Sequence, residues 1–517
     1  MTSTFHGLET ASRGMRTQQA ALQTTSHNIS NANTDGYSRQ RVNFGQTEPY
    51  PAAARNAPQM PGQIGTGVEA ESVQRIREGY LDQQFRGENA QSGYWEARHS
   101  SLERTEELLN EPSDQGLSSR MNQFYDALQD LSTNPEDSGA RAVVKERGVA
   151  LADSFNYMSD TLESNKADLA NQIGTNEDEI NSLLSNLNSV NKQIGNVEPN
   201  GQVPNDMYDE RDRLLDDLSK RMNIEVEKME PEGLASDVAE GKVNVYLLNG
   251  DGERMTYDSN GDGNADTELK LIDGENLDHR SIGIEEDSDE IGDVSLNWEN
   301  GNGTGEDIDS IDIKESPGSL AGMLEMHDGV DAEGNDLSGT YPDLKNQLDQ
   351  LAHDFATEFN DQHEQGEGLN NSTDAGTPAF FNVNAGSSED AASNIGVTDA
   401  IKEDTDKIAA SSDGNAGDGS NATELSNIKE DHFDEEYQSL IGEYGVQTAE
   451  AKQMMDNSAT LRDNVDSRRM EVSSVSLDEE MTNMIKFQQA YNAAARNITA
   501  VDEMLDRIIN NMGRVGR

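Results

Sequence analysis

The feature that most constrains this chain is the apolar pattern of its last long stretch, residues 477–512. From Met484 onward, apolar residues return in alternating steps of three and four, which is the heptad pattern of a coiled-coil helix. This C-terminal seam consists of Met484, Phe487, Tyr491, Ala494, Ile498, Val501, Leu505, Ile508 and Met512. Because polar and charged residues fill the positions between them, the helix has one narrow apolar stripe that needs a partner.

The first thirty residues contain a weaker stripe that can serve as this partner. Small or polar residues such as Gln18 and Thr25 alternate with the apolar positions, which recur every seven residues. The apolar positions of this N-terminal seam are Leu8, Met15, Leu22 and Ile29. Periodicity alone leaves two interpretations open, a helical hairpin within a globular domain or terminal helices that become ordered in a larger assembly. We favour assembly, because neither helix alone buries much apolar surface.

Length and composition exclude several classes of protein. A chain of 517 residues can hold about two to four domains. It has no cysteine, which excludes disulfides, thiolate metal sites and a cysteine nucleophile. No uninterrupted apolar stretch has the length of a membrane span, so we expect no membrane insertion. The N-terminus has neither an apolar core nor a cleavage motif, so we expect any export to proceed without a cleaved signal peptide.

The charge balance is strongly acidic. The chain has 39 basic and 99 acidic residues, a net charge of −60. Binding to nucleic acid requires the opposite sign, because affinity comes from neutralising phosphates. The acidic residues are spread over segments that keep apolar periodicity, which indicates a folded protein with an acidic surface. At molar salt the Debye length is about 3 Å, so such a surface repels itself little. The composition therefore predicts a halophilic source.

The order of the patterns predicts a mainly α protein with a β-rich insertion. We expect terminal coiled-coil helices, an elongated helical bundle and a central acidic β domain. Within the bundle, helices are expected over 138–194 and 318–364, an irregular excursion over 45–67, and a break near 473–476. The predicted domains are a terminal coiled coil (1–33 with 477–517), a helical rod (34–224 with 316–365 and 429–476), an acidic β insertion (225–315) and a loop-rich segment with some β structure (366–428).

One stretch of the insertion has the spacing of a calcium-binding loop. Oxygen-bearing side chains occupy alternate positions around Gly263, which permits the sharp turn that such loops need. The candidate ligands are Asp258, Asn260, Asp262, Asn264 and Asp266. Leu269 stands where a calcium loop has its bidentate acid, so the alternatives are a weak calcium site and an acidic hairpin turn.

Motifs for catalysis fail on inspection. His363-Glu364 begins like a zinc-protease motif, but Glu367 occupies the position of the second histidine. No nucleophile elbow, P-loop or dinucleotide fingerprint is present. We therefore expect no enzyme activity, no catalytic residue and no cofactor other than a weakly bound calcium ion.

Two motifs at the chain ends resemble those of the axial proteins of the bacterial flagellum. Residues 28–37 are similar to the N-I-A-N-A-N-T-x-G-Y motif of rod, hook and junction proteins, and the continuation over 38–40 points to the first hook–filament junction component. The motif residues are Asn28, Asn31, Asn33, Gly36, Tyr37, Ser38, Arg39 and Gln40. At the other end, residues 477–480, 485–491 and 501–505 are similar to the family's C-terminal motif. Asp35 and Ser474 depart from the family pattern, where proline and glycine are common.

The resemblance implies a structural role. Subunits would form a helical layer between hook and filament, with the two seams as the assembly interface in an inner tube and the insertion outside. The implied partners are further copies of the chain, hook protein, the second hook–filament junction protein and a flagellar export chaperone on the C-terminal seam. The implied location is extracellular, after type III export. Two alternatives remain open, namely another hook or junction component, and a secreted adhesin-like surface protein that acts through the acidic β insertion.

Overall fold

The structure is a computed structural model of the chain. It describes residues 4–51, 62–109, 116–258, 267–287, 290–301, 303, 306–331, 334–369, 376–383, 387–428 and 434–511. The long helices are α1 (Thr4–Ser30), α2 (Gly79–Leu109), α3 (Leu117–Thr133), α4 (Ser138–Val197), α5 (Asn205–Ser219), α7 (Tyr341–Glu364), α11 (Asp434–Ser473) and α12 (Leu477–Asn511). Shorter helices are α6 (Ser319–Asp328), α8 (Ala391–Asn394), α9 (Asp399–Glu403) and α10 (Ser420–Ile428).

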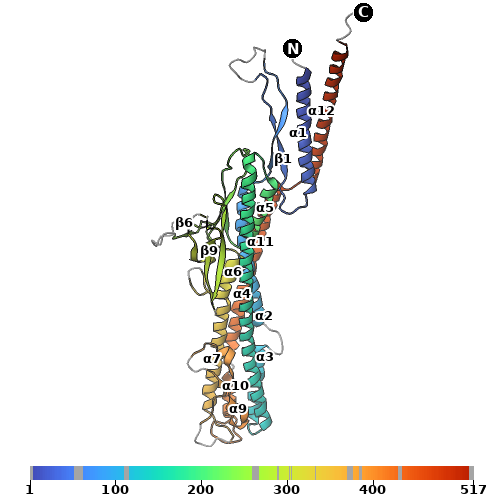
Figure 1. Cartoon of the computed structure of the whole chain (residues 1–517). Coiled ribbons are helices and arrows are strands. Elements are labelled where there is room, and N and C mark those ends of the chain that lie inside the picture. Colours follow the sequence, from blue (N-terminus) through green and yellow to red (C-terminus); the bar gives the residue numbers. More distant parts are fainter. Residues whose placement is uncertain are drawn as a thin grey trace, which may run out of the picture.

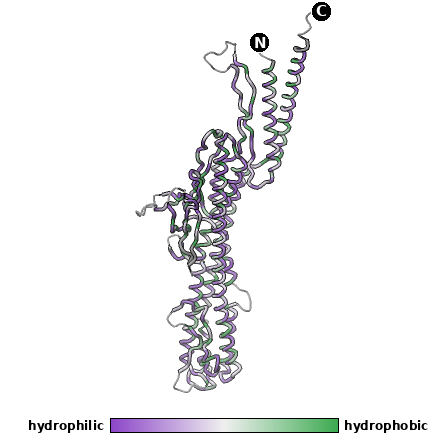
Figure 2. The backbone as a smooth tube through the Cα atoms, viewed as in Figure 1, coloured by the Kyte–Doolittle hydropathy of each residue, from purple (hydrophilic) through white to green (hydrophobic). Residues whose placement is uncertain are grey.

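The body of the molecule is an elongated helical bundle built along α4 (Figure 1). This helix has 60 residues and therefore extends about 90 Å at ~1.5 Å per residue. Its apolar positions recur at helical spacing and are fully buried, for example Leu151, Phe155 and Ile180. Polar and apolar residues alternate along the long helices (Figure 2), as expected for amphipathic helices that share one core. The mainly α fold with a β insertion is confirmed.

The insertion is an antiparallel sheet of six strands in the order β10-β9-β8-β7-β4-β3. The strands are β3 (Ile224–Lys228), β4 (Val243–Leu247), β7 (Lys270–Asp273), β8 (Asp278–Asp287), β9 (Glu290–Trp298) and β10 (Ile308–Ile311). The sheet packs on α4, where the amide groups of Asn181 and Asn191 bond to the backbone of Ile282 and Val243. Because the sheet and α4 share one apolar core, the insertion is an integral part of the body.

The sequence patterns miss one element of local structure and extend another too far. The irregular excursion expected over 45–67 is flanked by an antiparallel ribbon that these patterns do not predict, β1 (Gln40–Gln46) with β2 (Val68–Arg75), because cross-strand pairing stabilises strands whose own alternation is weak. The helix expected over 318–364 is interrupted after α6, where Gly329 adopts a left-handed conformation with φ 76°. Such a glycine ends a helix, whereas the surrounding apolar periodicity alone predicts a continuous helix.

The two chain ends project together from one end of the body (Figure 1). Helices α1 and α12 lie side by side, and the ribbon β1–β2 lies next to α1. The predicted break before the last helix is present, since α11 ends at Ser473 and α12 begins at Leu477. We assigned residues 40–75 to the rod, whereas the ribbon packs against α1. The division of the chain into domains otherwise stays a prediction.

Candidate assembly interface and the joint beneath it

The C-terminal seam faces α1 along the projecting pair of helices. Each seam residue from Met484 to Leu505 is half-buried, while most residues between them are exposed. Phe44 of the ribbon also contacts the seam, with its ring 6.0 Å from that of Phe487 in an edge-to-face arrangement. The side chain of Ile508 lies outside the described residues. The seam thus packs against the chain's own α1 and still leaves part of its surface uncovered.

The N-terminal seam is less buried than a second face of α1. Leu8, Met15, Leu22 and Ile29 are half-buried. The fully buried residues of α1 are small or polar, namely Thr17, Ala21, Thr25 and Asn28. The hydroxyl oxygen of Thr17 lies within hydrogen-bond distance of two carbonyl oxygens, that of Arg13 on the same helix at 2.9 Å and that of Val68 at 3.1 Å, so this face packs closely on the ribbon. Apolar periodicity did not predict this contact, because it depends on small side chains that let a strand approach.

The side chain of Asn28 ties the end of α1 to the start of β1. Its Oδ1 accepts from the backbone N–H of Gln40 at 3.0 Å, and its Nδ2 donates to the carbonyl of Gln40 at 2.8 Å. The same Nδ2 donates to Glu480 Oε2 of α12 at 3.2 Å, and Oδ1 also accepts from the hydroxyl of Tyr37 at 2.8 Å. Asn28 is 0% exposed. One buried amide therefore connects α1, the following turn, the ribbon and α12.

The turn between α1 and β1 positions Tyr37 and Gln40, two of the partners of Asn28. Gly36 has φ 75°, a conformation that favours glycine, and an added Cβ would lie 3.6 Å from Arg213. Burial and the nearby Asp209 carboxylate raise the pKa of Tyr37 well above its usual range, so its hydroxyl stays protonated and can donate to Asn28. Within the same motif, Asn31 donates only to the carbonyl of His27 at 3.1 Å, and Asn33 is exposed.

Residues 38–40 fasten this turn to the body. The backbone N–H of Ser38 donates to Asp209 on α5 at 3.2 Å, and Gln40 Nε2 donates to Asp206 at 3.1 Å. Arg39 pairs with Glu479 on α12 at 2.7 Å, and its N–H donates to the carbonyl of Ser473 at 2.8 Å. We call residues 28–40 together with these contacts the joint. Motif positions separated by up to 452 residues from their partners meet here.

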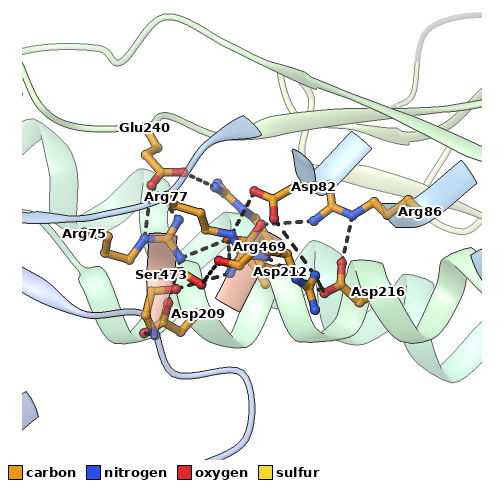
Figure 3. A network of polar contacts seen from close by, with 12 residues as sticks. Arg75, Arg77, Asp82, Arg86, Asp209, Asp212, Asp216, Glu240, Arg469 and Ser473 are labelled. Carbon is orange, nitrogen blue, oxygen red and sulfur yellow. Dashed lines mark hydrogen bonds and ion pairs between the residues drawn. The ribbon is translucent and has the colours of Figure 1, made fainter. Parts of the chain in front are cut away.

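A buried network of arginine and acidic side chains lies directly below the joint (Figure 3). Arg75, at the end of β2, is 2% exposed and pairs with Asp209 at 2.8 Å and with Asp212 at 2.9 Å. The network also includes residues of α2, of α11 and of the loop that precedes β4. Its members are Arg75, Arg77, Asp82, Arg86, Asp209, Arg211, Asp212, Asp216, Glu240 and Arg469. Five guanidinium groups and five carboxylates are thus paired.

The network lowers the pKa of two of its acidic members, Asp212 and Glu240, whereas burial raises the pKa of Asp209 despite its pair with Arg75. Burial acts to raise the pKa of Asp212, but the guanidinium groups of Arg77 and Arg75 prevail and hold that pKa far below its usual range. Burial likewise opposes ionisation of Glu240, whereas Arg75 and Arg211 lower its pKa to about 2. The network therefore clamps the ribbon onto α5 at neutral pH. The resemblance pointed to the motif residues but not to these arginines, since nothing in their local sequence marks them.

The remaining candidates do not form a site in the described residues. Of the predicted calcium ligands only Asp258 is described, and the other four lie outside the described residues, so that site stays a prediction. Within the described ranges, no group of three or more His, Asp or Glu side chains is placed to hold a metal ion. His363 is fully buried in the core, where it bonds to Pro378 and Ala409, and burial lowers its pKa to about 4. Among the described helices, none is long and apolar enough to cross a membrane.

Comparison with known proteins places these features in a family. Residues 102–381 match the helical domain of flagellar hook-associated protein FlgK. Residues 8–37 match the flagella basal body rod protein model, and residues 466–512 match the flagellar basal body rod FlgEFG protein C-terminal model. The two terminal matches contain the Asn28–Tyr37 turn and the whole C-terminal seam.

Full-length relatives agree with these matches. The chain is 41% identical to flagellar hook-associated protein 1 of Bacillus subtilis over 539 residues, which covers 100% of both chains. It is 26% identical to the protein of the same name from Escherichia coli, covering 97% of this chain and 99% of that protein. The corresponding protein of Salmonella typhimurium is 24% identical, with 97% and 98% covered.

Proposed function

Because this chain belongs to the flagellar hook-associated protein 1 family and is a structural component of the hook–filament junction, we propose that it assembles through the projecting pair of helices α1 and α12. The joint at Asn28 supports this proposal most directly. A single buried amide fixes both terminal helices and the ribbon to the body, while the pair itself extends beyond the body with its seam only half-buried. Such a pair is held at a defined angle and still offers surface to neighbouring subunits.

The chain assembles with other axial components of the flagellum. We propose that the specific partners are further copies of this chain in a helical layer, hook protein and the second hook–filament junction protein. The absence of cysteine and the half-buried seam support type III export of an unfolded chain. An export chaperone that covers the C-terminal seam would prevent premature association of its apolar side chains.

Substitution in the seam tests the proposal. Ile498→Asp places a charge on the half-buried stripe that α12 turns towards α1. We expect cells that express this variant to produce hooks without filaments and to shed flagellin, because a desolvated carboxylate opposes packing of the pair. The matched control is Thr499→Asp, which adds the same charge at the adjacent exposed position.

Electron microscopy of the cells and a swimming assay provide the readout. Thermal unfolding of the purified variants should show a body as stable as in the unsubstituted chain, since the seam lies outside the bundle core. Normal filament number and motility with Ile498→Asp would contradict assembly through this pair of helices.

A further inference from the structure

Helix α12 has a second apolar surface that the seam does not use. Leu477, Met481 and Ile485 follow each other at four-residue spacing and are 46%, 53% and 57% exposed. At ~100° per residue their centre is rotated by roughly 120° from the centre of the seam, so they point away from α1. We call these three residues the knobs. They lie at the base of the projecting pair, next to the joint.

Farther along the same pair lies a groove between α1 and α12. It has a volume of about 760 Å³ and is open at the surface. Residues without long side chains line most of it, among them Gly7, Ala11, Gly14, Ala490, Ala493 and Ala500. The helices approach each other there with little side-chain volume between them. Met504, at the outer end of the groove, is 56% exposed. Apolar surface of this kind is usually covered by another chain.

Charge favours a second copy of this chain as that partner. Residues 1–47 and 481–517, which include α1 and most of α12, contain nine of the 39 basic residues but only five of the 99 acidic residues. Exposed Lys486, Arg496 and Arg507 lie within about one helical turn of the groove-lining residues of α12. Exposed Asp478 lies beside the knobs. The knobs thus have an acidic neighbour and the groove has basic ones, so their charges are of opposite sign, and the small residues of the groove leave room for large apolar side chains.

We propose that the knobs of one copy insert into the groove of a neighbouring copy that is displaced along the axis of the pair. This inference rests on the proposed function. From Met481 to Asn497, at the middle of the groove, the helix advances 16 residues, which corresponds to a displacement of about 24 Å. Because the two surfaces differ, the contact is head-to-tail. Such a contact continues from copy to copy and generates a helical array instead of a closed dimer.

Cysteine cross-linking tests this contact in the full chain, which has no cysteine of its own. The variant Met481→Cys, Asn497→Cys places one thiol among the knobs and one in the groove. The two sites are about 24 Å apart on one rigid helix, so they cannot form a disulfide within a chain. After mild oxidation of isolated hook–filament structures, we expect a ladder of dimers, trimers and larger species. Two singly substituted chains, mixed in one cell, should give only the heterodimer.

The control keeps Met481→Cys and moves the second thiol to the exposed position Thr499, on the side of α12 away from the groove. Electron microscopy of the same cells separates the two hypotheses. Filaments on hooks without a ladder would overturn the knob-and-groove contact and leave the proposed function intact. A ladder that is equally strong in the control, or dimers from Met481→Cys alone, would also overturn it. If the folded Cys variants leave hooks bare, they are expressed together with the unsubstituted chain, which builds the junction. The absence of a ladder under these conditions would refute the contact as well.

Discussion

The substitution Asn28→Asp tests whether one buried amide holds the terminal helices to the body. It preserves the shape of the side chain and replaces the Nδ2 donor with an oxygen. That oxygen would face the carbonyl of Gln40, now 2.8 Å from Nδ2, and the carboxylate of Glu480, now 3.2 Å from it. The two contacts change from hydrogen bonds into acceptor–acceptor repulsion at a position that is 0% exposed.

The magnitude follows from these two contacts. Leaving the buried Gln40 carbonyl without its donor costs about 1–3 kcal/mol. Two carboxylates at this separation repel by about 5 kcal/mol at an effective dielectric constant of ~20. The new carboxyl can avoid part of this repulsion by binding a proton, which raises its pKa. We therefore expect the free energy that keeps the joint closed to fall by about 3–5 kcal/mol at pH 7.

Amide hydrogen exchange at Gln40 measures this quantity, because its N–H donates to Asn28 Oδ1 and exchanges when the joint opens. A loss of ~3 kcal/mol corresponds to exchange that is about 150-fold faster. The matched control is Asn31→Asp, at a half-buried position where Nδ2 donates to the His27 carbonyl at 3.1 Å and Oδ1 accepts from the Thr34 hydroxyl at 3.3 Å. That change should accelerate exchange at Gln40 less than about threefold, because water solvates the new charge.

The pH dependence provides a second check. The carboxyl group that Asn28→Asp introduces would have a raised pKa in the folded state, because burial and the Glu480 carboxylate both oppose its ionisation. Its destabilising effect is therefore present at high pH and is relieved as the pH falls through that value. The difference between Asn28→Asp and Asn31→Asp should shrink in acid. Equal exchange rates for the two variants at pH 7 would refute the role that we assign to Asn28.

Three further substitutions test the ion-pair network next to the joint and the packing of α4. Because the pKa of Glu240 is lowered to about 2, its ion pairs stabilise the fold by about 3 kcal/mol above pH ~4.5, and this contribution is lost as the pH falls from 4.5 towards 2. Urea unfolding of the unsubstituted chain and Glu240→Gln should show a stability difference that shrinks over that range, and a constant difference would contradict the ion pairs. On α4, Gly148→Ala should lower the unfolding temperature by the equivalent of ~1–3 kcal/mol, since its Cβ would lie 2.8 Å from Phe380 Cε1. No atom lies within 4 Å of the Cβ that Gly174→Ala would add, so this substitution should raise stability by ~0.5–1 kcal/mol. If both glycine substitutions changed the stability in the same direction, the packing described for α4 would be wrong.

Much of the fold could be predicted from the sequence because it depends on local periodicity. The heptad spacing from Met484 to Leu505 placed every described seam residue on the half-buried side of α12. The apolar spacing of α4 and the turn before Leu477 were likewise visible. The ribbon β1–β2 was missed, because strands of this length owe their stability to a partner strand and to the small residues of α1.

The candidate site was only partly predictable. The family resemblance singled out Asn28, Tyr37 and Gln40 but gave no reason for their presence. The structure supplies the reason, since their polar groups satisfy one another in a buried place where each unpaired group would be costly. The arginines below the joint had no signal at all, because a buried ion pair such as Arg75–Asp212 joins residues 137 positions apart.

The sequence by itself determined which residues form long helices, which face of each helix is apolar, and that both chain ends need a partner. Each of these properties depends on the spacing of neighbouring side chains along the chain. Only the tertiary structure decided that the seam is shared with the chain's own α1, that other surfaces of α12 remain for neighbours, and that one asparagine fixes the pair to the body. Those properties depend on polar and steric contacts between segments that are distant in the sequence, and such contacts exist only after the chain has folded.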